Sequence, residues 1–75
     1  MNETQKMLYD TVINAPEFHI DKYIKNKLVA SSHKINYTGL KSILDDCAKY
    51  SLASDFMMYT LNIVLLKMKN EQEIL

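Results

Sequence analysis

The sequence predicts an all-α fold, a small bundle of three to four short helices with a central, highly apolar C-terminal helix. The chain has 75 residues with one glycine and one proline, and residues that favour helices are common in it. No segment alternates apolar and polar residues with the period of a strand. Residues 52–68 are apolar nearly all the way round a helix. We therefore expect a single helical domain over residues 1–75, with residues 71–75 as a frayed tail.

The first helix is expected over residues 3–14, where Asn2 or Thr4 can cap its amino end. It ends before Pro16, because proline disfavours helical geometry in the residue that precedes it. The residues of its predicted apolar side are Met7, Leu8, Tyr9, Val12 and Ile13.

A second helix is expected to start near Asp21, whose carboxylate can accept the unpaired backbone N–H groups of a first turn. Residues 31–34 are expected to break this helix. Its predicted apolar stripe consists of Tyr23, Ile24, Leu28 and Ser31.

The third helix, from Asn36 or Thr38 to Tyr50, has the clearest amphipathic pattern in the chain. Polar and charged residues fill the side of this helix that faces away from its apolar stripe. The apolar residues at helical spacing are Leu40, Ile43, Leu44, Cys47 and Ala48.

The fourth helix is expected from residue 52 to about Asn70, with Ser51 or Ser54 as its cap. Acidic residues beyond Asn70 oppose the helix dipole, which favours an end before them. Two apolar stripes follow opposite sides of this helix. The first stripe consists of Met57, Leu61, Val64, Leu65 and Met68. The second stripe consists of Leu52, Phe56, Tyr59, Ile63 and Leu66.

A helix with two apolar stripes needs cover on both sides, and three short helices are expected to cover only one of them. The other stripe is therefore predicted to bind protein, either a second copy of the chain or a foreign partner. Met58 joins the candidates, because it cannot face the same core as its neighbour Met57 and methionine suits adaptable surfaces. The predicted protein-interface residues are Phe56, Met58, Tyr59, Ile63 and Leu66.

The charge composition does not direct the chain toward nucleic acid or an anionic membrane. Nine acidic residues balance nine basic ones, and every basic residue is lysine. The lack of arginine removes the residue that most often contacts guanine. The bias toward lysine is typical of AT-rich coding sequences, as in low-GC bacteria, their phages and plasmids. The longest strongly apolar run, residues 56–66, falls short of the roughly 20 residues of a membrane span. A lone cysteine and an amino end without a signal pattern predict a cytoplasmic protein.

Residues 26–44 resemble the helix-turn-helix of bacterial and phage repressors, over about a quarter of the chain. The resemblance implies that Ala30 is the small residue where the two helices cross and that Ile35 fills the turn. Lys34 departs from the pattern, because its position favours glycine, and two adjacent aspartates at 45 and 46 would lie near phosphates. The residues that would contact DNA are Lys34, Asn36, Tyr37, Thr38, Lys41 and Ser42.

The sequence predicts no catalytic residue, metal ligand or cofactor site. His19 and His33 lie far apart in the chain, without a cysteine or carboxylate at a spacing that would complete a metal site. Cys47 lies on the apolar stripe of the third helix, where burial is expected rather than nucleophilic reactivity. Asp45 and Asp46 diverge on a helix, so they cannot act together on one substrate. We expect no enzyme and no small-molecule substrate.

These observations predict a small non-enzymatic protein-interaction module, a regulator or inhibitor that binds another protein through an apolar helical surface. A homodimer is expected, and no membrane partner is expected. The alternative function is a helix-turn-helix transcriptional regulator that binds DNA through residues 26–44.

Overall fold

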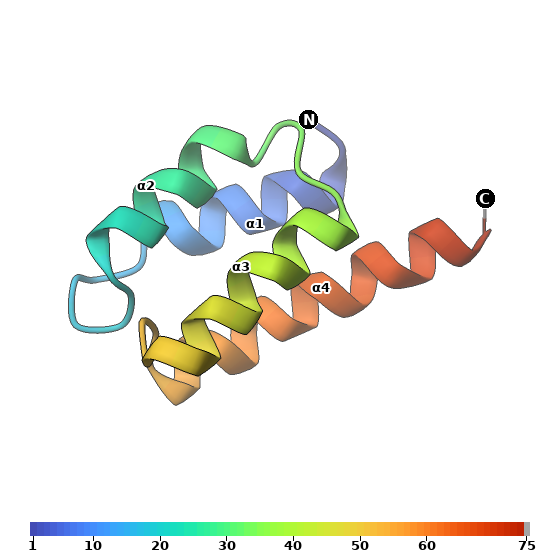
Figure 1. Cartoon of the computed structure of the whole chain (residues 1–75). Helices are drawn as coiled ribbons and strands as arrows, with labels where there is room; N and C mark the ends of the chain where they lie inside the picture. The colour runs from blue at the N-terminus through green and yellow to red at the C-terminus, as the bar shows by residue number, and fades with distance from the viewer. Residues whose placement is uncertain (75) are drawn as a thin grey trace.

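The computed structural model describes the backbone of residues 1–74 and the side chains of residues 1–72. Its helices are α1 (Glu3–Ile13), α2 (Lys22–Ser31), α3 (Tyr37–Tyr50) and α4 (Asp55–Ile74), and the described residues contain no strand. Figure 1 shows α2 beside α1 and α3 beside α4, with the carboxyl end of α4 reaching past α3. The predicted all-α bundle is confirmed.

The helices begin where polar side chains cap their first turns. Asn2, Asp21, Asn36 and Ser54 each accept a hydrogen bond from the backbone N–H three residues further along. Such caps satisfy N–H groups that have no partner within the helix, and each is worth about 1 kcal/mol. Local hydrogen bonds therefore fix the first turn of each of the four helices.

The core forms around the first apolar stripe of α4. Met57, Leu61, Val64 and Met68 are all buried, because α4 packs against both α3 and α1. Helix α1 also packs against α2, which lies at the edge of the bundle. The buried residues of the first three helices are Thr4, Leu8, Val12, Ile24, Leu28, Leu40, Ile43, Leu44 and Cys47.

Three residues that the sequence pattern placed on the apolar stripes of the first three helices lie at the surface instead. Ile13, Tyr23 and Ala48 are exposed. Each occupies the margin of its stripe, and α1, α2 and α3 are covered by too few neighbours to bury a wide arc. Those three assignments were wrong, although the helices that carry them are present.

The bounds of α4 differ from the prediction at both ends. The helix begins at Asp55 rather than at residue 52, directly after Ser54, which is one of the two predicted caps, and it continues past Asn70 to Ile74. The hydroxyl of Thr4 in α1 donates a hydrogen bond to the carboxylate of Glu71, which ties this last part of α4 to the bundle. The end predicted near Asn70 was therefore wrong. Leu75, the last residue of the predicted frayed tail, lies outside the described residues.

Two loops are joined where α4 begins. The backbone N–H of Asp21 donates to the carbonyl of Leu52 at 2.7 Å, and the N–H of Ser54 donates to the carbonyl of His19 at 2.8 Å. The ring nitrogen Nδ1 of His19 also lies 2.8 Å from the Ser54 hydroxyl oxygen. These bonds hold the loop between α1 and α2 against the loop between α3 and α4.

Ser51 ends α3 in the left-handed conformation, with φ of 55°. A side chain makes this conformation unfavourable by roughly 1–2 kcal/mol, whereas glycine adopts it readily. We expect Ser51→Gly to raise the free energy of unfolding by about 0.5–1 kcal/mol, because relief of this strain exceeds the extra entropy of the unfolded chain. Urea denaturation measures the change.

Ser42→Gly is the matched control for this prediction. Ser42 is exposed in the interior of the same helix, where glycine costs about 0.5 kcal/mol or more relative to serine. The control should therefore lower stability. A loss of stability in Ser51→Gly as well would contradict the proposed strain at residue 51.

Candidate protein-interaction surface

An uncovered apolar stripe follows the outer side of α4. It consists of Phe56, Tyr59, Ile63 and Leu66, here named the α4 face, whose side chains are 64%, 69%, 41% and 57% exposed. Their spacing of three, four and three residues places them in one row along the helix. Large apolar side chains gathered in this way differ from the scattered exposed residues that every protein surface contains.

The α4 face lies opposite the buried stripe of the same helix. Leu61 and Val64 are at most 1% exposed, and the helices that pack on α4 lie on their side. Because each turn takes 3.6 residues, positions five apart such as Leu61 and Leu66 point in very different directions. The same sequence segment thus supplies both part of the core and a row of apolar groups in contact with solvent.

Met58 and Leu52 differ from the four residues of the α4 face. Both are partly buried and pack against the core. Met58 lies between the two sides of α4, and Leu52 precedes the helix. Of the five predicted interface residues, the structure places four in one exposed row and Met58 beside it.

The α4 face continues onto the loop between α1 and α2. Phe18 is 79% exposed, and its ring centroid lies 4.5 Å from that of His19, which in turn lies 5.3 Å from Phe56. The sequence did not place Phe18 beside α4, because the bridge between the two loops is what brings it there. A large aromatic residue in a predicted loop was the one signal that the sequence offered.

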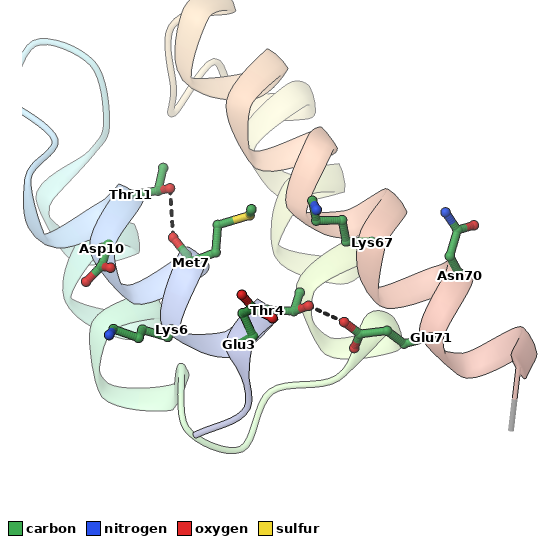
Figure 2. A pocket seen from close by; sticks show the side chains of 9 residues that line it. All are labelled: Glu3, Thr4, Lys6, Met7, Asp10, Thr11, Lys67, Asn70 and Glu71. Atoms are coloured by element: carbon green, nitrogen blue, oxygen red, sulfur yellow. Dashed lines mark hydrogen bonds between the residues drawn. The ribbon is translucent and has the colours of Figure 1, made fainter.

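A groove of about 600 Å³ separates α1 from the carboxyl half of α4. Figure 2 shows Met7 pointing from α1 toward α4, and the hydrogen bond between Thr4 and Glu71 crossing between the helices. The groove mixes acidic, basic and apolar groups, and Lys67 and Asn70 place it beside the end of the α4 face. Its lining residues are Glu3, Thr4, Lys6, Met7, Asp10, Thr11, Lys67, Asn70 and Glu71.

The region that resembles a helix-turn-helix folds as α2, a connection over residues 32–36, and α3. Ile35 is buried in that connection, as the resemblance implies. Ala30 is exposed, however, and the small buried residue is Ser32. In the described part of the chain, α2 and α3 are not among the helix pairs with extensive packing. The expected crossing of two helices at Ala30 was therefore wrong.

Five of the six candidate DNA-contact residues are exposed, and Tyr37 is partly buried against the core. The side-chain oxygen of Asn36 accepts the N–H of Gly39 at 2.9 Å, so it serves as a cap. The Lys41 ammonium lies 3.4 Å from the carboxylate of Asp45 on the same helix face. Two of the candidate polar groups thus already have partners within the chain. The remaining exposed candidates are Lys34, Thr38 and Ser42.

Cys47 is 1% exposed among the core residues of α3. Burial, together with the negative charges of Asp46 and Asp21, raises the pKa of its thiol. A raised pKa lowers the thiolate fraction, and the thiolate is the reactive form. Within the described residues, no group of three or more histidine, cysteine or acidic side chains is placed to hold a metal ion.

The contact between His19 and Ser54 was not predicted from the sequence, since 35 residues separate them. A serine beside a histidine can form part of a nucleophilic site when a third group orients the imidazole. Here the Ser54 hydroxyl oxygen also accepts the N–H of Met57 at 3.1 Å, as the cap of α4. The pair therefore connects two loops and starts a helix, which accounts for its geometry.

No helix in residues 1–74 is both long enough and apolar enough to cross a membrane. Comparisons with protein-family models, with curated proteins and with solved structures found no match to this chain, so its function is inferred from its own residues.

Proposed function

We propose that this chain is a non-enzymatic protein-interaction module, a regulator or inhibitor that binds protein through the α4 face. The observation that supports the proposal is the contiguous row of four large apolar side chains on the side of α4 opposite the core. The partner is either a foreign protein or a second copy of the chain. A chain of this kind acts by occupying a surface of its partner.

The composition of the α4 face suits binding better than folding. Phe56 and Tyr59 are aromatic residues with few rotatable bonds, and such residues supply much of the binding free energy at protein interfaces. Exposed as they are, they contribute little to the burial that stabilises the monomer. A bound protein would remove their apolar surface from water, which is the favourable change that drives association.

Photo-cross-linking in cells tests the proposal. In one variant a photoreactive benzophenone amino acid replaces Leu66 on the α4 face. In a second variant, the matched control, it replaces the exposed Lys41 on α3. We expect Leu66 to form a discrete protein adduct and Lys41 to form none, because Leu66 lies in the exposed apolar row and Lys41 lies on a polar side of α3. The mass of the adduct identifies a second copy of the chain, at twice the chain mass, or a foreign protein.

The same pair of positions separates protein binding from DNA binding. If residues 26–44 contact DNA, Lys41 should label nucleic acid, and purified protein should bind a duplex with an affinity that falls steeply with salt. We expect neither result, since the net charge is zero and the Lys41 ammonium lies near Asp45. Nucleic-acid adducts at Lys41 together with no protein adduct at Leu66 would refute the proposal.

A further inference from the structure

We infer that the occupant of the α4 face is a second copy of this chain, whose α4 packs antiparallel to the first, an inference that rests on the proposed function because it uses the same surface. The two helices would form a short two-fold symmetric pair outside the two bundles. The spacing of the apolar residues and the position of the charges beside them support this arrangement.

The spacing of the α4 face is that of a coiled-coil seam. Phe56 and Ile63 occupy the first core position of successive heptads, and Tyr59 and Leu66 occupy the second. Two like helices that pack side by side need this repeat on both of their surfaces, and in a homodimer one sequence supplies it to both. The seam spans two heptads, which matches the part of α4 that bears exposed apolar residues.

One antiparallel register pairs all four apolar residues of both copies. In it, Phe56 lies opposite Leu66 of the partner subunit, and Tyr59 lies opposite Ile63 of the partner subunit. Two-fold symmetry repeats both pairs, so each large aromatic ring meets an aliphatic side chain. The contact is closed, because the same residues serve on both copies.

The charges that flank the seam favour this register. Asp55, Asn62 and Lys69 are exposed, and they recur every seven residues along one flank. The antiparallel register brings Asp55 beside Lys69 of the partner subunit twice, with Asn62 near the two-fold axis. A parallel pair would place Asp55 beside Thr60 instead, and a shift by one heptad would place it beside Asn62. Only the proposed register unites opposite charges on this flank.

Sedimentation equilibrium of the full chain tests the inference. We expect a reversible monomer–dimer equilibrium in the micromolar range, because the seam is short compared with the interfaces of obligate dimers. Ile63→Asp should abolish the dimer while the far-UV circular dichroism of the chain, which reports its helix content, is unchanged. Asp55→Lys and Lys69→Asp should each weaken the dimer about three- to tenfold, since each variant breaks two ion pairs.

The double variant Asp55→Lys/Lys69→Asp is the matched control for these charge reversals. It recreates opposite charges across the interface, so its dissociation constant should return to within about twofold of the wild-type value. Any effect of the reversals on α4 itself persists in the double variant, which separates the interface from the helix. Failure of the rescue would overturn the antiparallel register.

Cross-linking determines the orientation independently. In a Cys47→Ala background, chains with Asp55→Cys should link through a short thiol reagent to chains with Lys69→Cys. Chains with Asp55→Cys alone should not link to each other, because the two residues would lie about 21 Å apart along the helix axis. Linking of Asp55→Cys alone would indicate a parallel pair and would overturn the inference.

Failure of this inference can be told from failure of the proposed function. A chain that remains monomeric at millimolar concentration, with a Leu66 photo-adduct to a foreign protein, would overturn the homodimer and support the interaction module. A monomeric chain with no protein adduct at Leu66 would overturn both. An adduct of twice the chain mass supports both.

Discussion

Leu61→Ala is expected to lower the free energy of unfolding by about 3 kcal/mol, whereas Leu66→Ala should change it by less than about 0.5 kcal/mol. Leu61 is 0% exposed and Leu66 is 57% exposed, although they lie five residues apart on α4. The first substitution removes buried methyl groups and leaves a cavity, and the second removes groups that already contact water. For a domain of this size, the first loss is a large fraction of the total stability.

Urea denaturation at low protein concentration, where the monomer is the main species, measures both changes. The two variants form a matched pair, because the same substitution is made in the same helix and its effect on helix propensity is the same in both. Equal losses of stability would show that Leu66 is part of the folded core. That result would contradict the assignment of the α4 face to binding.

Cys47 is expected to react with a thiol reagent at least about 1,000-fold more slowly in the native protein than in denaturant. The thiol is buried in the core, so reaction requires an opening of the bundle. Its raised pKa further lowers the thiolate fraction at neutral pH. A colorimetric thiol assay with and without urea measures the two rates, and rapid stoichiometric reaction of the native chain would contradict burial.

The same thiol gives stability a dependence on alkaline pH. Because the pKa of Cys47 is raised by folding, the folded state holds its proton when the unfolded state has lost it. This contribution to stability is fully present below the unfolded thiol pKa of about 8.5 and is lost as pH rises through the folded value. Cys47→Ala should remove this part of the alkaline slope. An identical slope in the two proteins would contradict the raised pKa.

The proposed dimer depends on both sides of α4, because the buried side holds in place the helix whose exposed side binds the partner. The residues that hold the helix against the bundle, such as Leu61 and Val64, keep the α4 face straight and in one row. The bridge between the loops at Ile20 and Ala53 fixes the start of the same helix. Substitutions in the core are therefore expected to weaken association indirectly, through loss of the folded helix, whereas substitutions in the α4 face act on association alone.

The sequence by itself determined the helices and the starting points of the first three. Asn2, Asp21 and Asn36 could be recognised as caps because a cap acts on a backbone N–H only three residues away. The two apolar stripes of α4 were visible for a similar reason, since helical periodicity depends only on the spacing of neighbours along the chain. These features need no knowledge of how the helices pack.

The tertiary structure alone decided which residues at the edges of the apolar stripes are buried, and which residues far apart in the sequence come into contact. Tyr23 and Ala48 have the spacing of buried residues but remain exposed, because burial depends on the number of helices that pack nearby. Phe18 reaches Phe56 by way of His19, and Thr4 reaches Glu71, only because the folded chain brings separate segments together. Spacing along a single helix contains no information about such contacts, which arise from the packing of the whole bundle.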